Sequence, residues 1–222
     1  MCLTSDLDYT QRMNADINWA LREGGMFFQG ESEVQKSLRR ITARLNALGI
    51  DYAVVGGMAL FLHGFYRFTE DVDILVTRKG LEKIHEVLEG SGYRPPFTGS
   101  KNLRDTENGV RIEFLVAGEF PGDGKPKPVA FPEPGSVATD LDGIQMLNLE
   151  ALIELKLASG ISGLGRRKDL SDVQEVIRML SLPEAMAEQL NPYVQESYRE
   201  LWQELEAARK QREADGLLEP QG

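Results

Sequence analysis

Two adjacent glycines and two aspartates stand out in the stretch "VVGGMALFLHGFYRFTEDVDILV", residues 54–76. Gly56 and Gly57 end one apolar run, and Asp71 and Asp73 lie inside the next one, "DVDILV". Side chains alternate across a strand, so the two aspartates share one face, with Cα atoms about 7 Å apart. The spacing therefore predicts a pair of carboxylates that converge on one spot.

A third carboxylate is expected from the stretch "VRIEFLV", residues 110–116. Its apolar residues alternate, so that Glu113 faces away from them together with Arg111. If this strand is a neighbour of the "DVDILV" strand, Glu113 completes a three-carboxylate cluster with Asp71 and Asp73.

Three crowded carboxylates repel one another, so a cation must hold them together. Oxygen-only ligands of this kind suit Mg²⁺ or Mn²⁺, and two such ions would clamp the attacking and leaving oxygens of a phosphoryl displacement. A strand, a turn at Gly56 and Gly57 and a helix start would bring backbone N–H groups close to a triphosphate. The residues thus predict metal-dependent phosphoryl chemistry.

The elements that position these residues predict an α/β fold, in the mixed α+β sense, with a mixed sheet flanked by helices and a helical C-terminal part. Strands are expected at 51–55, 71–76 and 110–116, and helices at 11–22, 32–48, 58–64, 81–88, 149–159, 169–180 and 193–214. Residues 117–140 are rich in Pro and Gly and are expected to form a loop with a short edge strand at "PVAF". The predicted domains are an N-terminal extension (1–30), a core (31–140) and a C-terminal helical region (141–222).

The stretch "GGMALFLHGFYRFTEDVDILV" resembles the first motif of the nucleotidyltransferase superfamily, a Gly-Gly or Gly-Ser turn followed about a dozen residues later by Asp-x-Asp. The flanking "HGFYRFTEDVDIL" and the later "RRKDLSDV" look most like stand-alone bacterial and archaeal proteins related to abortive-infection (AbiEii-like) nucleotidyltransferase toxins. The resemblance covers roughly residues 52–177. It implies a nucleotidyltransferase fold and the transfer of a nucleoside monophosphate from an NTP to an acceptor hydroxyl, with Mg²⁺ or Mn²⁺.

Carried onto this sequence, the resemblance implies that Gly56 and Gly57 hold the nucleotide phosphates and that Asp71 and Asp73 ligate the metals. Glu113 matches a third carboxylate that ligates one metal in many members and activates the incoming hydroxyl in some. Several toxin-like members have no carboxylate there. Gly57 stands where many relatives carry serine, which removes one hydroxyl contact to phosphate.

Two further candidates follow from helical spacing. Lys156 lies in the middle of the apolar stripe of helix 149–159, where an unpaired ammonium would be costly, so a carboxylate or a nucleotide phosphate should pair with it. Alternatively, its stem covers the core while its head reaches water. Asp169 shares an apolar stripe and can point inward, or it can cap its helix with Asp172 at the third position. The resemblance favours a site role for both Lys156 and Asp169.

The remaining nucleotide-binding candidates are Arg67, Thr69 and Lys168. Arg67 and Thr69 precede the aspartate pair, and Arg67 is interpreted either as a phosphate contact or as a structural ion pair. Lys168 belongs to the basic patch 166–168, which is either a phosphate contact or a solvated helix start. His63 is expected to be packed and not catalytic.

Composition limits the alternatives. A chain of 222 residues with 41% hydrophobic residues can bury one sizeable core, and its net charge of -10 disfavours a general nucleic-acid coater. The single cysteine, Cys2, excludes a disulfide framework. No apolar run is long enough to cross a bilayer, so we expect a cytoplasmic protein without a membrane partner.

The predicted reaction is in-line attack by the acceptor hydroxyl on the α-phosphate of an NTP, with release of pyrophosphate. Lys156 would neutralise phosphate charge, and Glu113 or Asp169 would act on the acceptor. The acceptor could be a tRNA end, a protein or a small molecule. The alternative is a non-catalytic nucleotide-binding member of a toxin-antitoxin pair. The helix at 193–214 is expected to dock on the body or on a second copy, so the protein partner is either an antitoxin or a homodimer mate.

Overall fold

The computed structural model describes residues 8–215. This part of the chain divides into two compact units. The first, here called the sheet unit, contains the chain up to Gly118 together with Phe131–Asn148. The second, the helical unit, contains Glu119–Ala130 and the chain from Leu149 onward.

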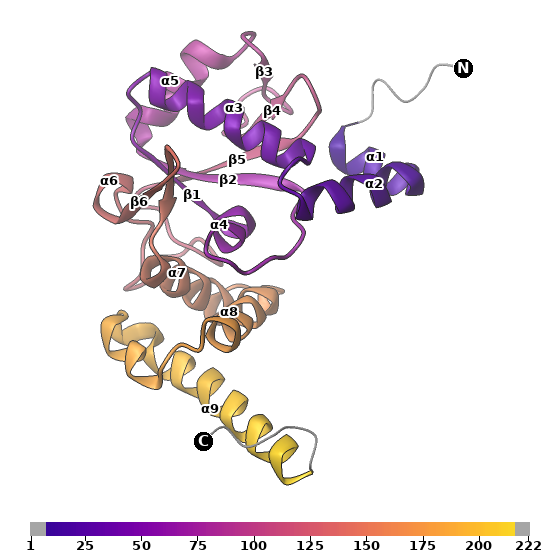
Figure 1. The fold of residues 1–222 in the computed structure, drawn as a ribbon. Coiled ribbons are helices and arrows are strands. Elements are labelled where there is room, and N and C mark those ends of the chain that lie inside the picture. Colours follow the sequence, from indigo (N-terminus) through magenta and orange to yellow (C-terminus); the bar gives the residue numbers. More distant parts are fainter. Residues whose placement is uncertain (1–7, 216–222) are drawn as a thin grey trace. The chain divides into compact units, whose positions relative to one another are not determined.

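The sheet unit is built on a seven-stranded mixed sheet with the order β3-β4-β5-β2-β1-β7-β6 (Figure 1). The central strand β2 runs antiparallel to β1 and parallel to β5, and β1 runs parallel to β7. The mixed sheet confirms the predicted fold class. The strands are β1 (Tyr52–Val55), β2 (Asp71–Val76), β3 (Tyr93–Arg94), β4 (Leu103–Asp105), β5 (Arg111–Val116), β6 (Ala138–Leu141) and β7 (Ile144–Leu147).

Helices of the sheet unit cover one sheet face with apolar side chains. Leu38 and Ile41 of α3 and Ile84 of α5 share a buried cluster with Ile74 and Phe114 of the sheet. Because residues alternate along a strand, this leaves the aspartates of β2 on the other face. The helices are α1 (Tyr9–Ala15), α2 (Ile17–Phe28), α3 (Glu33–Ala47), α4 (Gly56–Leu62), α5 (Arg78–Leu88) and α6 (Pro134–Val137).

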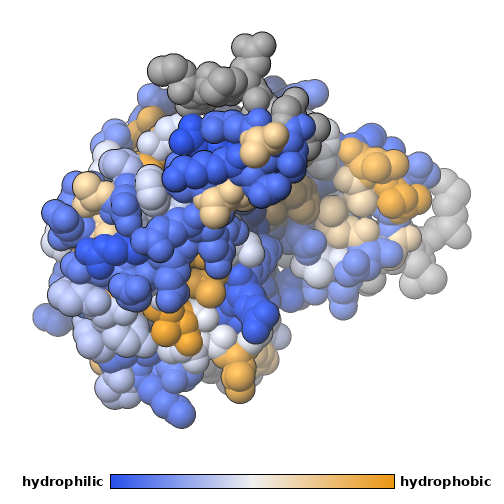
Figure 2. Space-filling model, turned by 90° about the horizontal axis from the view of Figure 1, so that it is seen from below, coloured by the Kyte–Doolittle hydropathy of each residue, from blue (hydrophilic) through white to orange (hydrophobic). Residues whose placement is uncertain are grey.

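The helix α2 also carries apolar residues that stay in contact with water. Ile17, Leu21 and Phe28 are all exposed. Figure 2 shows an orange, hydrophobic area of surface at its right. The opposite side of α2 is anchored by Trp19 and Phe27, which are buried in the core.

In the part of the helical unit that the structure describes, up to residue 215, three α-helices and one 3-10 helix pack against each other. The elements are α7 (Leu149–Ser162), α8 (Arg167–Leu180), η1 (Glu184–Gln189) and α9 (Pro192–Ala214). Val194 and Tyr198 of α9 are buried, and the Tyr198 hydroxyl donates to the carbonyl of Pro183 at 3.1 Å. Burial raises the pKa of Tyr198 to about 12. Of the two predicted roles of this helix, docking on the body is therefore observed.

Several local predictions are wrong. The stretch "PVAF" is not a strand, and the only regular elements between Ala117 and Asp140 are α6 and the start of β6. The single helix expected at 11–22 is two helices, because Asp16 ends α1 and caps α2 by accepting from the Trp19 amide. The predicted boundary at 140 falls inside the β6–β7 hairpin, which joins the sheet through the pair Val54 and Met146.

Within residues 8–215, none of the helices combines the length and the apolar character needed to cross a membrane.

Candidate functional site

The three predicted carboxylates lie on neighbouring strands. The parallel pairing of β2 with β5 sets Asp73 opposite Glu113 and Asp71 opposite Arg111. Opposed residues point to the same face of a sheet, so all four side chains share the face away from the apolar cluster. The expected adjacency of the two strands is thus present in the structure.

The cation between these carboxylates is an arginine of the chain itself. The Nη2 atom of Arg111 lies 3.1 Å from Oδ2 of Asp71 and 2.9 Å from Oε1 of Glu113. Burial disfavours the charged guanidinium, but the charges of Glu113 and Asp71 outweigh this and raise the pKa of Arg111. Arg111 therefore neutralises part of the repulsion that sequence reasoning had assigned to a metal ion.

The chemistry of the donors still fits a hard divalent ion. Among the residues that the structure describes, no group of three or more His, Cys, Asp or Glu side chains is arranged to hold a metal. Mg²⁺, however, is commonly bound by one or two carboxylates, and substrate phosphates and water complete its shell. Asp71 and Asp73 on one face of β2 are such a pair, and Glu113 is the next carboxylate, now paired with Arg111.

The two glycines pack directly against this pair. Gly56 has a φ of 63°, and a Cβ at this position would lie 1.9 Å from Oδ2 of Asp73. A Cβ at Gly57 would lie 2.7 Å from Oγ1 of Thr69, and that hydroxyl donates to Oδ1 of Asp71 at 2.9 Å. Only residues without side chains fit here, so the start of α4 brings bare backbone against the carboxylates.

Arg67 and His63 lie close to the aspartates in sequence but have local partners. The Nη1 atom of Arg67 donates to the carbonyl of Phe68 at 3.3 Å. The Nε2 atom of His63 lies 2.7 Å from the carbonyl oxygen of Leu147 in β7. This contact agrees with the expectation that His63 is packed.

In the helical unit, Lys156 has two carboxylate partners. Its Nζ atom lies 2.9 Å from Oδ1 of Asp169 and 2.7 Å from Oδ2 of Asp172, and its side chain is only 9% exposed. The predicted anionic partner is therefore a carboxylate, and the alternative with the ammonium in water is wrong. Asp172 as a partner was missed, although it follows Asp169 by three residues and so shares its side of α8.

Asp169 joins this network and does not cap its helix. The residue before α8 is Arg166, and no side chain caps the helix end. Oδ2 of Asp169 accepts a 2.7 Å hydrogen bond from the hydroxyl of Ser159. Burial alone would raise the pKa of Asp169, but Lys156 and Ser159 outweigh burial and lower it. Lys168 is exposed in the first turn of α8 and has no part in this network.

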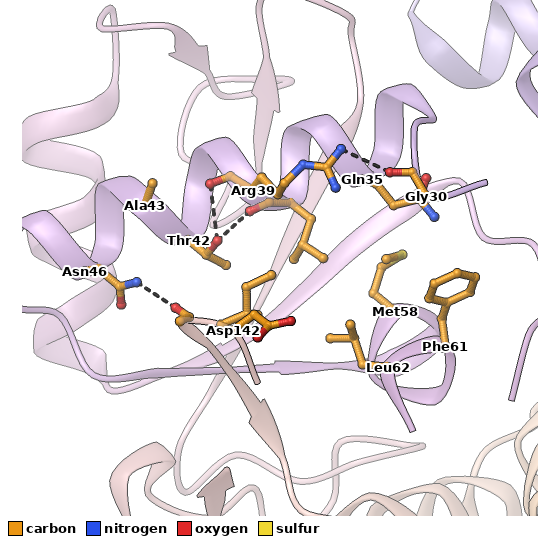
Figure 3. A pocket seen from close by; sticks show the side chains of 13 residues that line it. Gly30, Gln35, Arg39, Thr42, Ala43, Asn46, Met58, Phe61, Leu62 and Asp142 are labelled. Carbon is orange, nitrogen blue, oxygen red and sulfur yellow. Dashed lines mark hydrogen bonds between the residues drawn. The ribbon is translucent and has the colours of Figure 1, made fainter. Parts of the chain in front are cut away.

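The sheet unit also contains an apolar cavity that is separate from the predicted site residues. It has a volume of about 560 Å³ between α3 and α4 (Figure 3). Leu38, Met58, Phe61 and Leu62 supply its apolar lining. None of the carboxylates discussed above lines it.

A family model described as "Nucleotidyl transferase AbiEii toxin, Type IV TA system" matches residues 38–221. The match covers most of the chain, so the protein belongs to this nucleotidyltransferase family, and the resemblance found from the motifs is confirmed.

The chain is also similar to several solved structures at low sequence identity. The complex of ANT(2")-Ia with adenylyl-2"-tobramycin is 12% identical, with 75% of this chain and 97% of that chain covered and a TM-score of 0.49. An antigenic nucleotidyltransferase-like protein from Paracoccidioides brasiliensis is 16% identical, with coverages of 82% and 91% and a TM-score of 0.45. JHP933 from Helicobacter pylori is 16% identical, with coverages of 82% and 93% and a TM-score of 0.43. Among curated proteins, none matches this sequence.

Proposed function

We propose that this chain transfers a nucleoside monophosphate from an NTP to an acceptor hydroxyl in a reaction that requires Mg²⁺ or Mn²⁺. The observation that carries the proposal is the contact between the glycine turn and the aspartate pair, where a Cβ on Gly56 would lie 1.9 Å from Asp73. A turn without side chains beside paired carboxylates suits a metal-bound triphosphate. Membership of a nucleotidyltransferase family supports the same reaction.

The metal would be held by Asp71 and Asp73, with Glu113 as a further ligand. When bound, such an ion supplies charge stabilisation at the transferred phosphoryl group and orients the leaving pyrophosphate. Thr69 fixes Oδ1 of Asp71 through its hydrogen bond. The backbone at Gly56 and Gly57 leaves room for phosphate oxygens next to these carboxylates.

In the proposed step, the acceptor oxygen forms a bond to the α-phosphorus while the bond to the bridging oxygen of the pyrophosphate breaks. The acceptor proton passes to a carboxylate. Glu113 is favoured as this base, because its side chain is 30% exposed and its partner Arg111 is 47% exposed, and an ion pair in contact with water can be exchanged for another partner. Both oxygens of Asp169 are already engaged, by Lys156 and by Ser159.

We assign Lys156 a structural role within the helical unit, in place of the phosphate contact expected from the sequence. Its ammonium is shared by Asp169 and Asp172, so a phosphate would have to displace one of these carboxylates. Arg67, Thr69 and Lys168 stay candidates for nucleotide contacts. The acceptor is a tRNA end, a protein or a small molecule, and the family name adds an antitoxin as the expected protein partner.

A second candidate function is a non-catalytic nucleotide-binding member of a toxin-antitoxin pair. The observation that favours it is Arg111, which satisfies Asp71 and Glu113 without any metal ion. Metal-dependent binding of NTP without transfer to any acceptor would support this alternative.

The direct test is to incubate the protein with each α-labelled NTP, Mg²⁺ and an extract of cellular RNA and protein. We expect label in an acceptor, and a loss of about 100-fold or more in Asp71→Asn and Asp73→Asn. The matched control is Asp51→Asn, because Asp51 is exposed and precedes β1. Transfer that persists in the double variant Asp71→Asn/Asp73→Asn would refute the assignment.

A further inference from the structure

A row of three arginines crosses the sheet next to the carboxylates. The strand pairings set Arg94 of β3 opposite Arg104 of β4, Arg104 opposite Arg111 of β5, and Arg111 opposite Asp71 of β2. Opposed residues point to the same side of a sheet. The three guanidinium groups therefore extend from Asp71 toward the edge of the sheet, on the same face as the aspartate pair, over a width of about 14 Å.

This arrangement costs stability, because like charges on directly opposed residues repel one another. Each arginine has a different environment. Arg111 is paired with Asp71 and Glu113, Arg104 lies 3.2 Å from Asp8, and Arg94 is exposed on the short strand β3. The chain has a net charge of -10, so these three cations on one face of the sheet form a local positive patch that can attract an anion.

A pocket of about 620 Å³ lies along the row. Arg104 and Arg111 line it together with Lys101 and Phe97. The Phe97 ring is 68% exposed. The wall of the pocket is attached to the sheet, because Oδ1 of Asn102 accepts a hydrogen bond from the Phe114 amide at 3.0 Å. Cationic side chains beside an exposed aromatic ring are the combination with which proteins bind single-stranded nucleic acid, by phosphate pairing and base stacking.

The order of the strands separates this pocket from the glycine turn. The turn follows β1 on one side of β2, whereas the row lies on β5, β4 and β3 on the other side. A donor triphosphate at the turn would therefore leave the row free, and an in-line transfer needs donor and acceptor on opposite sides of the reacting phosphorus.

We propose that the arginine row and the Phe97 pocket bind the acceptor, and that the acceptor is a single strand of nucleic acid. The delivery of its terminal hydroxyl to the carboxylates rests on the function proposed above, whereas strand binding does not. Several cations in a line match repeated phosphates better than the single charge of a small molecule, and the aromatic ring offers a surface to a base.

The test measures binding without any NTP, by fluorescence anisotropy of a labelled oligonucleotide of about ten residues across a salt series. In the full-length protein, Arg94→Gln/Arg104→Gln should weaken binding by about tenfold or more and reduce the slope of log K against log salt by about 1.4. Phe97→Ala should weaken binding by about fivefold or more. The control is Lys79→Gln/Arg22→Gln, which removes two exposed positive charges from α5 and α2.

Three results would overturn the inference. The first is that Arg94→Gln/Arg104→Gln binds the strand as tightly as the control does, or that Arg94→Gln alone, which changes an exposed residue and should keep the wild-type melting temperature, does so. The second is that a mononucleotide binds as tightly as the strand. The third is that the arginine variant loses affinity for ATP but not for the strand, which would assign the row to the triphosphate. Strand binding that depends on the row without any nucleotide transfer would support this inference and count against the proposed function alone.

Discussion

Both units of the molecule contain acidic side chains around one cation, but the two clusters differ in exposure. In the sheet unit, Arg111 is 47% exposed and its partners Asp71 and Glu113 are 25% and 30% exposed. In the helical unit, Lys156 is 9% exposed, and Asp169 and Asp172 are 17% and 5% exposed. The same chemistry is thus found once at the surface and once in the interior.

The difference indicates what each cluster can do. Ion pairs in contact with water contribute little to stability and can be exchanged for another partner, such as a metal or a phosphate. A desolvated cluster depends on each of its members, because the loss of one leaves a buried charge without compensation. The exposed cluster is therefore suited to ligand binding, and the buried cluster is suited to holding α7 and α8 together.

The largest expected effect is the loss of the buried cation. Lys156→Met should lower the free energy of unfolding by about 3–5 kcal/mol, since Asp169 and Asp172 would lose the ammonium that compensates their charges. Urea denaturation of the full-length chain measures this. The matched control is Arg178→Met, which removes an exposed pair with Glu175 and should cost at most about 1 kcal/mol. Equal losses in the two variants would contradict the comparison.

The exposed cluster can be disturbed through its glycine turn. Gly56→Ala forces a Cβ against Asp73, so we expect a loss of transfer of about 100-fold and weaker Mn²⁺ binding. Gly49 is the matched control, because it has the same φ of 63° and open space around its Cβ position. Both variants should lose about 1 kcal/mol of stability to backbone strain, and only the first should lose function. Mn²⁺ titration followed by electron paramagnetic resonance measures metal binding independently of transfer activity.

Removal of the exposed cation, Arg111, should have a smaller effect than Gly56→Ala, and it should change the Mn²⁺ affinity in the opposite direction. Arg111→Gln should change the free energy of unfolding by about 1 kcal/mol or less, because its ion pairs are partly hydrated. Mn²⁺ affinity should rise severalfold, since the guanidinium no longer competes for Asp71 and Glu113. Calorimetric titration with Mn²⁺ tests this. A decrease in affinity would mean that Arg111 orients the carboxylates instead of competing for them.

The comparison also separates what the sequence could predict from what it could not. Local periodicity was sufficient to predict β2, β5 and α7. It also placed Lys156 inside an apolar stripe, where a buried ammonium needs an anionic partner, and a carboxylate is found there. The strands β3 and β4 are two and three residues long, too short for any period, and they form only by pairing with residues distant in sequence. The row that begins at Arg94 therefore became visible only with the strand register.

The pairing of Arg111 with two carboxylates could not be predicted from the sequence for the same reason. Alternation along one strand predicts that Arg111 and Glu113 share a face, but it does not predict which residue of another strand lies opposite. The parallel register of β2 and β5 sets Asp71 there. The sequence could indicate a need for a cation, and only the pairing of two distant strands identified an arginine in that place.

The smallest expected effect is the loss at acid pH of the stability that ionised Asp169 contributes. The folded-state pKa of Asp169 is lowered, so its charged form stabilises the fold above the unfolded carboxylate pKa of about 3.9. This contribution is lost as the pH falls from that value through the lowered pKa. The stability difference between the wild type and Asp169→Asn should therefore be largest near neutral pH and should shrink below about pH 4. Denaturation midpoints between about pH 2 and pH 7 measure it, and a difference that stays constant over this range would mean that Asp169 ionises in the folded chain as it does in the unfolded one.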